Sequence, residues 1–325
     1  MNRRRFIVLL GGVATPWPLS ARAAGDVPVI GFLSGSTADS QLWPLSAFNQ
    51  GLAESGYVEG QNVLVEYRWA ESRYERLPEL AADLVRQKVA VIVAATTPAA
   101  VVAKAATKSI PIIFEIAGDP VALGLVGSLN RPEGNITGVT QLSSVSVPKR
   151  VGLLHEMLPA AKTIGLLLNP NDPKAEAQSR EVEAPARALG LRLEVVKATA
   201  IGEFEAAFAL LAERRADALI VGSSELLSRG RAQLAELAAR HAIPTIYQYR
   251  DYVEAGGLIS YGASLATSYR QVGVYAGRIL KGAKPVDLPV MQVSKFELVI
   301  NLKTAKALNL EIPPSLLAIA DEVIE

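Results

Sequence analysis

Cysteine is absent from this chain of 325 residues, and histidine occurs only twice, at His155 and His241. Without cysteine there is neither a disulfide nor a lipid-modified N-terminal cysteine, so we expect the body of the protein to be free in its compartment. His155-Glu156 begins like a metalloprotease helix, but Pro159 stands where the second ligand would be needed. We therefore predict no metal site and no cofactor.

A membrane-spanning run is also missing at the start of the chain. The apolar stretch Phe6–Ala14 has about half of the ~20 residues that cross a bilayer. It follows three arginines and precedes a small-residue cleavage site at residues 21–23, which is typical of a removable export signal. The arginines with Phe6 and Ile7 resemble a twin-arginine signal, and an ordinary Sec signal with an extra arginine is the alternative. Both interpretations predict cleavage near Ala23 and a periplasmic protein.

The chain has no excess of positive charge. Residues 1–23 hold four of the 33 Lys and Arg and none of the 32 Asp and Glu, so the mature chain has 29 basic and 32 acidic residues. This balance does not favour a nucleic-acid partner.

Short apolar runs that do not alternate with polar residues recur along the chain, and segments with helical periodicity lie between them. Such runs are typical of strands covered on both faces, so the pattern predicts repeated β-α units and an α/β fold. About 300 mature residues favour two domains. The runs are Val29–Leu33, Val89–Ala94, Ile110–Phe114, Ile164–Leu168, Ala218–Val221 and Ile243–Tyr247.

The two halves of the chain echo each other. Residues 91–97, a helix and residues 110–114 in the first half match residues 219–224, a helix and residues 243–247 in the second. Two similar α/β lobes would produce this repetition. The first lobe would begin near Val27 and the second near Leu142.

Ligands of open parallel sheets bind beyond the carboxyl ends of the strands, where this sequence has hydroxyl, amide, carboxylate and aromatic side chains. Thr97-Pro98 and Asp119-Pro120 begin helices and would turn backbone N–H groups toward a cleft, a typical site for carboxylates. Each of these residues could instead merely cap its helix. Glu115 is close to Asp119 in sequence and would form a salt bridge or a ligand contact. The candidate ligand contacts are Ser34, Ser36, Thr96, Thr97, Asp119, Asn169, Ser223, Tyr247 and Tyr261.

No catalytic motif is present. The sequence lacks G-x-G-x-x-G, the P-loop pattern and G-x-S-x-G, and both histidines fall in expected amphipathic helices away from strand ends. We therefore expect no enzymatic activity, with an exported α/β enzyme as the competing hypothesis.

Several blocks together resemble the ABC transporter substrate-binding proteins related to the tryptophan/tyrosine-type uptake receptors. The resemblance covers essentially the whole chain. The blocks are residues 29–34, 56–63, 67–70, 118–121, 259–262, 269–273 and 296–301.

This resemblance implies a type 1 periplasmic-binding fold with two Rossmann-like lobes, parallel sheets and a hinge of three crossings. It places residues 27–140 and about 258–283 in lobe 1, and about 141–257 and 284–325 in lobe 2. It further implies that the lobes close on one small ligand and that an ABC permease in the inner membrane recognises the closed form. A ligand receptor for a membrane sensor is the alternative.

The resemblance also bears on the ligand. Family members associated with aromatic amino acids suggest Thr96 and Thr97 for the carboxylate and Asp119 for the ammonium group. The sequence differs from those members at Tyr247-Gln248-Tyr249-Arg250, where they have small and acidic residues. An aromatic carboxylate is therefore an alternative to an amino acid as ligand.

Overall fold

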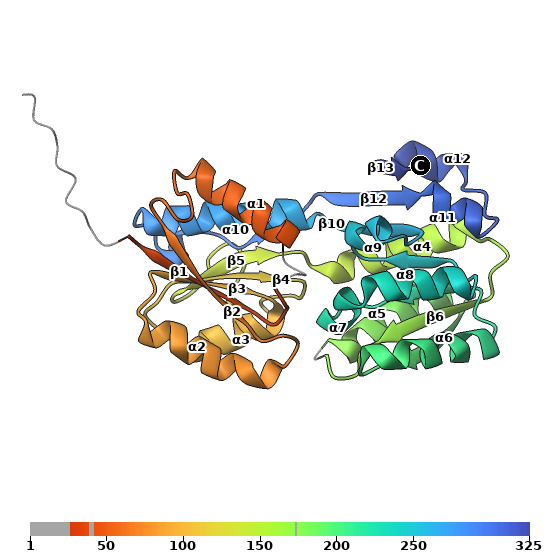
Figure 1. Ribbon diagram of the computed structural model, residues 1–325, viewed down its shortest axis with the longest axis horizontal. Coiled ribbons are helices and arrows are strands. Elements are labelled where there is room, and N and C mark those ends of the chain that lie inside the picture. The colour runs from red at the N-terminus through yellow and green to blue at the C-terminus, as the bar shows by residue number, and fades with distance from the viewer. Residues whose placement is uncertain (1–26, 39–41, 173) are drawn as a thin grey trace, which may run out of the picture.

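The computed structural model describes residues 27–38, 42–172 and 174–325. The expected export signal at residues 1–23 lies outside this part of the chain. Within the described part, the elements form two α/β lobes joined by a narrow set of crossing segments (Figure 1). Both lobes follow the β-α order that the apolar runs predict.

Lobe 1 is built on a six-stranded sheet in which every pair of neighbouring strands is parallel. Its strand order is β11-β5-β4-β3-β1-β2. The strands are β1 (Val29–Ser34), β2 (Leu64–Trp69), β3 (Val91–Ala95), β4 (Ile112–Ile116), β5 (Ile136–Thr140) and β11 (Met291–Gln292).

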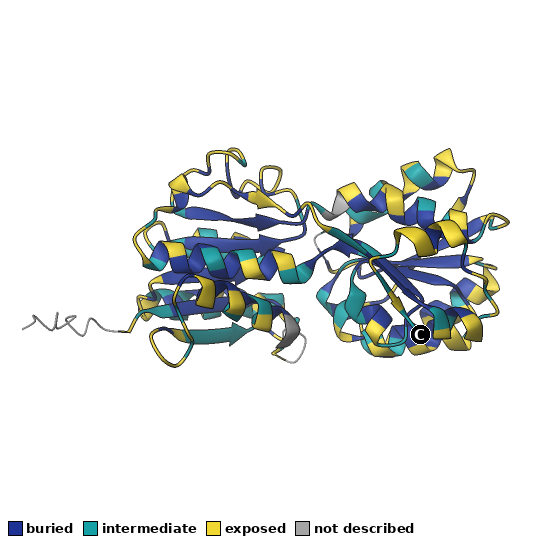
Figure 2. Cartoon of the chain, turned by 90° about the horizontal axis from the view of Figure 1, so that it is seen from above, coloured by how far each residue is buried: buried dark blue, intermediate teal, exposed yellow. Residues whose placement is uncertain are grey.

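Helices cover both faces of this sheet, which explains why its central strands read as continuous apolar runs. On one face, Phe32 and Val93 pack with α1 (Leu42–Glu54) and α10 (Leu265–Leu280). On the other, Leu33 and Phe114 pack with α2 (Leu77–Arg86) and α3 (Thr97–Ala106). Figure 2 shows the buried residues gathered in the sheets.

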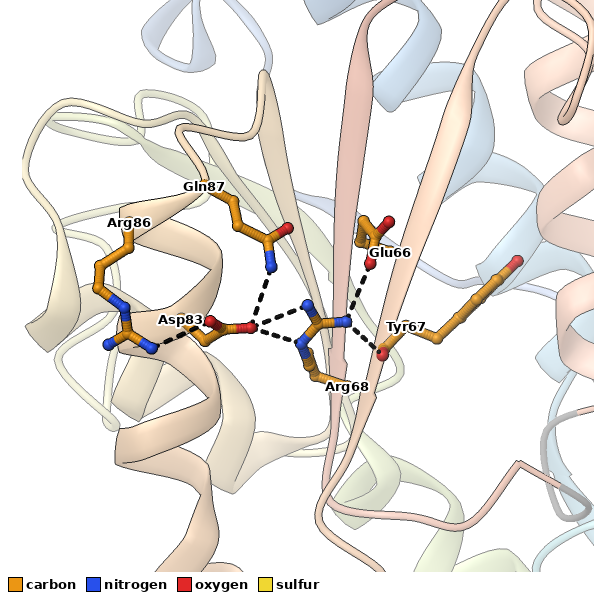
Figure 3. Close-up of polar contacts among 6 residues, drawn as sticks. All are labelled: Glu66, Tyr67, Arg68, Asp83, Arg86 and Gln87. Carbon is orange, nitrogen blue, oxygen red and sulfur yellow. Dashed lines mark hydrogen bonds and ion pairs between the residues drawn. The ribbon is translucent and has the colours of Figure 1, made fainter.

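An ion-pair network attaches the edge strand β2 to the helix α2 (Figure 3). Arg68 donates through Nε and Nη2 to Asp83 Oδ2, both at 2.8 Å, and through Nη1 to Glu66 at 3.1 Å. Asp83 also accepts from Arg86 and Gln87. The hydrogen bond from Arg68 lowers the pKa of Asp83, so this carboxylate stays ionised.

Lobe 2 is built on a seven-stranded sheet of order β13-β12-β10-β9-β8-β6-β7, in which only β10 and β12 pair antiparallel. The strands are β6 (Thr163–Leu168), β7 (Arg192–Lys197), β8 (Ala218–Val221), β9 (Thr245–Tyr247), β10 (Ile259–Ala263), β12 (Phe296–Asn301) and β13 (Glu322–Ile324).

Lobe 2 has a core on each face of its sheet, one around Leu166 and Ile300 and one around Phe204 and Phe208. Its helices are α4 (Val147–Met157), α5 (Ala175–Ala188), α6 (Phe204–Glu213), α7 (Glu225–Arg229), α8 (Arg231–Arg240), α9 (Arg250–Glu254), α11 (Leu302–Ala307) and α12 (Pro314–Ile319). The short 3-10 turns of lobe 2 are η3 (Ser143–Ser146) and η4 (Ile201–Glu203), and those of lobe 1 are η2 (Tyr74–Arg76) and η5 (Pro285–Asp287).

Strand pairing moves two of the expected lobe boundaries. Residues from about 258 were expected in lobe 1, but β10 pairs with β9 and β12 and so belongs to the sheet of lobe 2. Residues from 284 were expected in lobe 2, but η5 and β11 lie against β5, where Thr137 donates to the carbonyl of Leu288 at 2.6 Å. The chain therefore crosses between lobes after β5, between β10 and α10, and between β11 and β12.

None of the helices in the described ranges combines the length and the hydropathy that a membrane span requires. Over the same residues, no three His, Cys, Asp or Glu side chains come together as a metal site.

Candidate functional site

A cavity of about 460 Å³ lies between the lobes, beyond the carboxyl ends of their parallel strands. This volume is within the range of about 300–1,000 Å³ that is usual for small-molecule sites. Lobe 1 contributes Thr96, Thr97 and Glu115 to the lining, and lobe 2 contributes Ser223, Glu225 and Tyr249. Both lobes therefore face whatever the cavity holds.

The start of α3 supplies two of the predicted residues. Thr96 is the N-cap, and its Oγ1 accepts from the backbone N of Gly35 at 3.2 Å and of Ala99 at 3.4 Å. Its φ of 152° lies in a region that β-branched residues rarely adopt, and such backbone outliers gather at functional sites. Thr97 follows; its side chain is buried, and Oγ1 has no hydrogen-bond partner among the described residues.

Ser34 and Ser36 are buried beside the cavity without lining it. The hydroxyl of Ser34 donates to the carbonyl of Ala95 at 2.9 Å and so ties the end of β1 to β3. Ser36 reaches across the cleft, where its hydroxyl donates to Glu225 of lobe 2. It thus forms a direct contact between the lobes.

Asp119 and Asn169 hold turns and do not line the cavity. Asp119 is exposed, and its Oδ1 accepts from the backbone N of Val121 at 2.8 Å and of Ala122 at 3.3 Å. The Oδ1 of Asn169 accepts from the backbone N of Asn171 at 3.0 Å. Neither residue caps a helix: the helix expected at Asp119-Pro120 is absent, because the described chain between β4 and β5 forms turns, and each side chain closes a turn instead.

Among the three predicted residues of lobe 2 that remain, Ser223 lines the cavity. Tyr247 lies in the core of lobe 2, stacked on Tyr252 with ring centroids 4.7 Å apart. Tyr261 stacks on Phe296 at 5.7 Å. Because successive side chains of a strand point to opposite faces, a tyrosine near a strand end can face the helices instead of the cleft.

The polar residues at the cavity that were not among the candidate contacts include Glu115, Gln141, Glu225 and Tyr249. Three of them form a chain of hydrogen bonds between the lobes. Tyr249 donates to Gln141 Oε1 at 2.9 Å, and Gln141 Nε2 donates to Glu115 Oε1 at 2.7 Å. Gln141 follows β5, where the chain crosses to lobe 2, so this chain spans the hinge. In the sequence, Glu115 could be found because it directly follows an apolar run that predicts a buried strand.

Burial dominates the electrostatics of the cavity. It raises the pKa of Glu115 and of Glu225, and it raises the pKa of Asp251 to about 6. Hydrogen bonds from Ser268 and Gln141 to Glu115, and from Ser36 to Glu225, oppose this shift. The carboxyl groups of Glu115 and Glu225 are therefore held in place by hydrogen bonds but poorly solvated.

The fold and the two-lobe cavity are matched by a family model. The model of the ABC transporter substrate binding protein family matches residues 26–324. This chain belongs to that family. The expected resemblance and the expected fold are thereby confirmed, and the family is one of substrate-binding proteins.

Two relatives with named ligands are similar to this chain over most of its length. The tyrosine-binding protein of Clostridioides difficile (strain R20291) is 28% identical over 264 residues, which cover 81% of this chain and 76% of that protein. A structure of the ABC domain in complex with L-Trp from Streptococcus pneumonia is 29% identical with a TM-score of 0.83, covering 91% of this chain and 99% of that one.

A third relative has been solved without ligand, in an open arrangement. It is the ligand-free, open structure of a substrate binding protein with adhesive properties from Clostridium difficile, 27% identical with a TM-score of 0.68, covering 92% of this chain and 99% of that one. At similar identity the match to the L-Trp complex is better.

Proposed function

We propose that this protein is the periplasmic receptor of an ABC importer, which captures one small organic ligand between its lobes and delivers it to a permease in the inner membrane. The observation that carries the proposal is the cavity that both lobes line, with polar atoms of Thr97 and Asp251 that lack partners in the described part of the chain. Buried polar groups are normally hydrogen-bonded, so these atoms are suited to a bound molecule.

Of the predicted contacts, Thr96, Thr97 and Ser223 line the cavity, which supports them as ligand contacts. Ser36 supports closure through its hydrogen bond to Glu225 on the opposite lobe. The tyrosine- and tryptophan-binding relatives support an amine-bearing aromatic compound as the first ligand to test.

Calorimetry on the protein purified from the periplasm tests this proposal. The panel contains aromatic amino acids, aromatic amines and aromatic carboxylates. We expect one ligand to bind with one-to-one stoichiometry, and absence of binding across the panel would contradict the proposal. N-terminal sequencing of the same sample should begin after Ala23, whereas a retained leader would contradict periplasmic release.

Two competing functions are separated by further measurements. An exported enzyme would convert its ligand, so mass spectrometry after long incubation should return the bound compound unchanged if the protein is a receptor. A receptor for a membrane sensor would bind the same ligand without transport. Neighbouring permease and ATPase genes favour import, and a histidine-kinase gene favours sensing.

A further inference from the structure

The charges that line the cavity do not balance. Two arginines are paired: Arg231 lies 3.6 Å from Asp251, and Arg250 lies 2.8 Å from Glu254. The remaining lining charges are Glu115, Asp172, Glu225 and Lys174. Among the described residues, the cavity therefore carries three carboxyl groups outside any ion pair against one ammonium group.

Lys174 does not neutralise this excess by close contact. It lowers the pKa of both Glu115 and Glu225 at a distance, but within the described residues no ion pair joins it to an acid. The buried cation Arg150 lines a separate small cavity of about 10 Å³ and faces Glu181. Within the described residues, no ion pair therefore joins Glu115 or Glu225 to a cation.

Glu115 and Glu225 reach the cavity from opposite lobes, and each keeps a carboxylate oxygen available. Both donors to Glu115, Gln141 Nε2 at 2.7 Å and Ser268 Oγ at 2.6 Å, bind Oε1, and the side-chain donor to Glu225 is Ser36, on Oε2. Across the described ranges, Glu115 Oε2 and Glu225 Oε1 accept no hydrogen bond. A donor with positive charge is the group that complements both oxygens.

A second, independent feature of the lining also calls for a bound molecule. Thr97 is 6% exposed and lines the cavity, and its Oγ1 has no partner in the part of the chain that the structure describes. The hydroxyl can donate or accept, so it suits a polar group of the ligand beside the carboxylates. The acids are thus part of a ligand site and not an isolated acidic cluster.

We propose that the ligand is an organic cation with net positive charge, whose ammonium or guanidinium group lies between Glu115 of lobe 1 and Glu225 of lobe 2. This inference rests on the proposed function and names the ligand class. A zwitterionic amino acid brings a carboxylate of its own and leaves the excess negative charge of the cavity unchanged. A cation removes part of that excess and attracts both lobes to one group, which favours closure.

Two ligand series that vary charge on a constant scaffold test the proposal. The first is tyramine, L-tyrosine and 3-(4-hydroxyphenyl)propionate, which share one ring and run from net positive through neutral to negative. The second is agmatine, L-arginine and 4-guanidinobutyrate, in which net positive charge falls in the same order. Calorimetry should show the most cationic member of at least one series binding about tenfold or more tighter than the next. Binding in which neither series has its most cationic member as the tightest ligand overturns the inference while leaving the receptor function intact.

The variant Glu225→Gln separates the charge from the shape of the site. We expect about tenfold or greater loss of affinity for the cation and little change for the neutral analogue. Glu213→Gln, on the exposed end of α6, is the matched control and should leave both affinities unchanged.

Stability of the ligand-free protein gives a readout that needs no ligand. Glu225→Gln removes a desolvated charge that lies near Asp172 and Asp251, so its urea midpoint at neutral pH should be higher than that of the wild type. Glu213→Gln should have the wild-type midpoint. A lower midpoint for Glu225→Gln would show that the carboxylate is already stabilised within the protein, and would overturn the proposal. Absence of binding to both series would contradict the receptor function itself.

Discussion

The contact between α1 and α10 admits no side chain at two glycines, and this gives the sharpest stability prediction. A Cβ atom added to Gly273 would lie 2.1 Å from the carbonyl oxygen of Phe48 and 2.8 Å from the backbone N of Leu52. A Cβ added to Gly51 would lie 1.9 Å from the carbonyl oxygen of Arg270. The two helices therefore touch backbone to backbone.

Gly273→Ala should destabilise lobe 1 because the new methyl group meets backbone atoms, which cannot rotate away. Overpacking costs about 3 kcal/mol at the upper end of its usual range. Alanine regains about 1 kcal/mol of helix propensity relative to glycine. We expect a net loss of about 2 kcal/mol in the free energy of unfolding. Since Leu265 and Tyr269 of α10 line the cavity, ligand affinity should fall as well.

Urea denaturation followed by circular dichroism measures this loss, with Gly152→Ala in α4 as the control. A Cβ added to Gly152 meets no atom within 4 Å, so this variant should gain up to about 1 kcal/mol from helix propensity. Opposite signs for the two substitutions are the expected result. Wild-type stability of Gly273→Ala would refute the close approach of the helices.

Three further predictions concern the cavity. Burial raises the pKa of Glu115, Glu225 and Asp251 above their values in the unfolded chain, that of Asp251 to about 6. Between about pH 4 and these raised pKa values, the folded state therefore binds more protons than the unfolded state. The free energy of unfolding of the ligand-free protein should therefore fall as pH rises through this window. Chemical denaturation should show a shallower fall for Glu225→Gln than for the wild type, and an equal fall would contradict a raised pKa of Glu225. Thr97→Val removes a hydroxyl without a partner in the described chain, so the free energy of unfolding should rise by about 1 kcal/mol. Calorimetry should show ligand affinity about fivefold lower. Unchanged affinity would exclude the hydroxyl from the site. Tyr249→Phe leaves Gln141 Oε1 without its donor and should lower the free energy of unfolding by about 2 kcal/mol in urea denaturation. An unchanged free energy of unfolding would show that the chain of hydrogen bonds between the lobes does not stabilise the protein.

The lobes could be predicted from the sequence because parallel strands that are covered on both faces read as uninterrupted apolar runs. Val91–Ala95 and Ala218–Val221 are fully buried strands of this kind. The assignment of β10 was harder. Its place in the sheet depends on pairing with β9 before it and β12 well after it in the chain, and nothing within residues 259–263 specifies which sheet they join.

The site was predicted in part: Glu115 was expected in a salt bridge or a ligand contact but not placed among the candidate contacts, and Glu225 was not considered. The apolar run read from the sequence ends at Phe114 and places Glu115 after the strand, whereas β4 continues to Ile116 and carries Glu115 to the cavity. Asp119, four residues later, has a side chain that satisfies its own turn. Capping and ligand binding use the same residue types, so the sequence does not separate them.

The central claim, that one small ligand binds between the lobes, is tested most directly by a crystal structure of the protein with the tightest ligand found by calorimetry. The account predicts electron density for a single molecule in the cavity, in contact with Thr97 and Ser223 and with a positive group between Glu115 and Glu225. Density for the ligand outside the cavity, with the space between the lobes filled only by water, would contradict it.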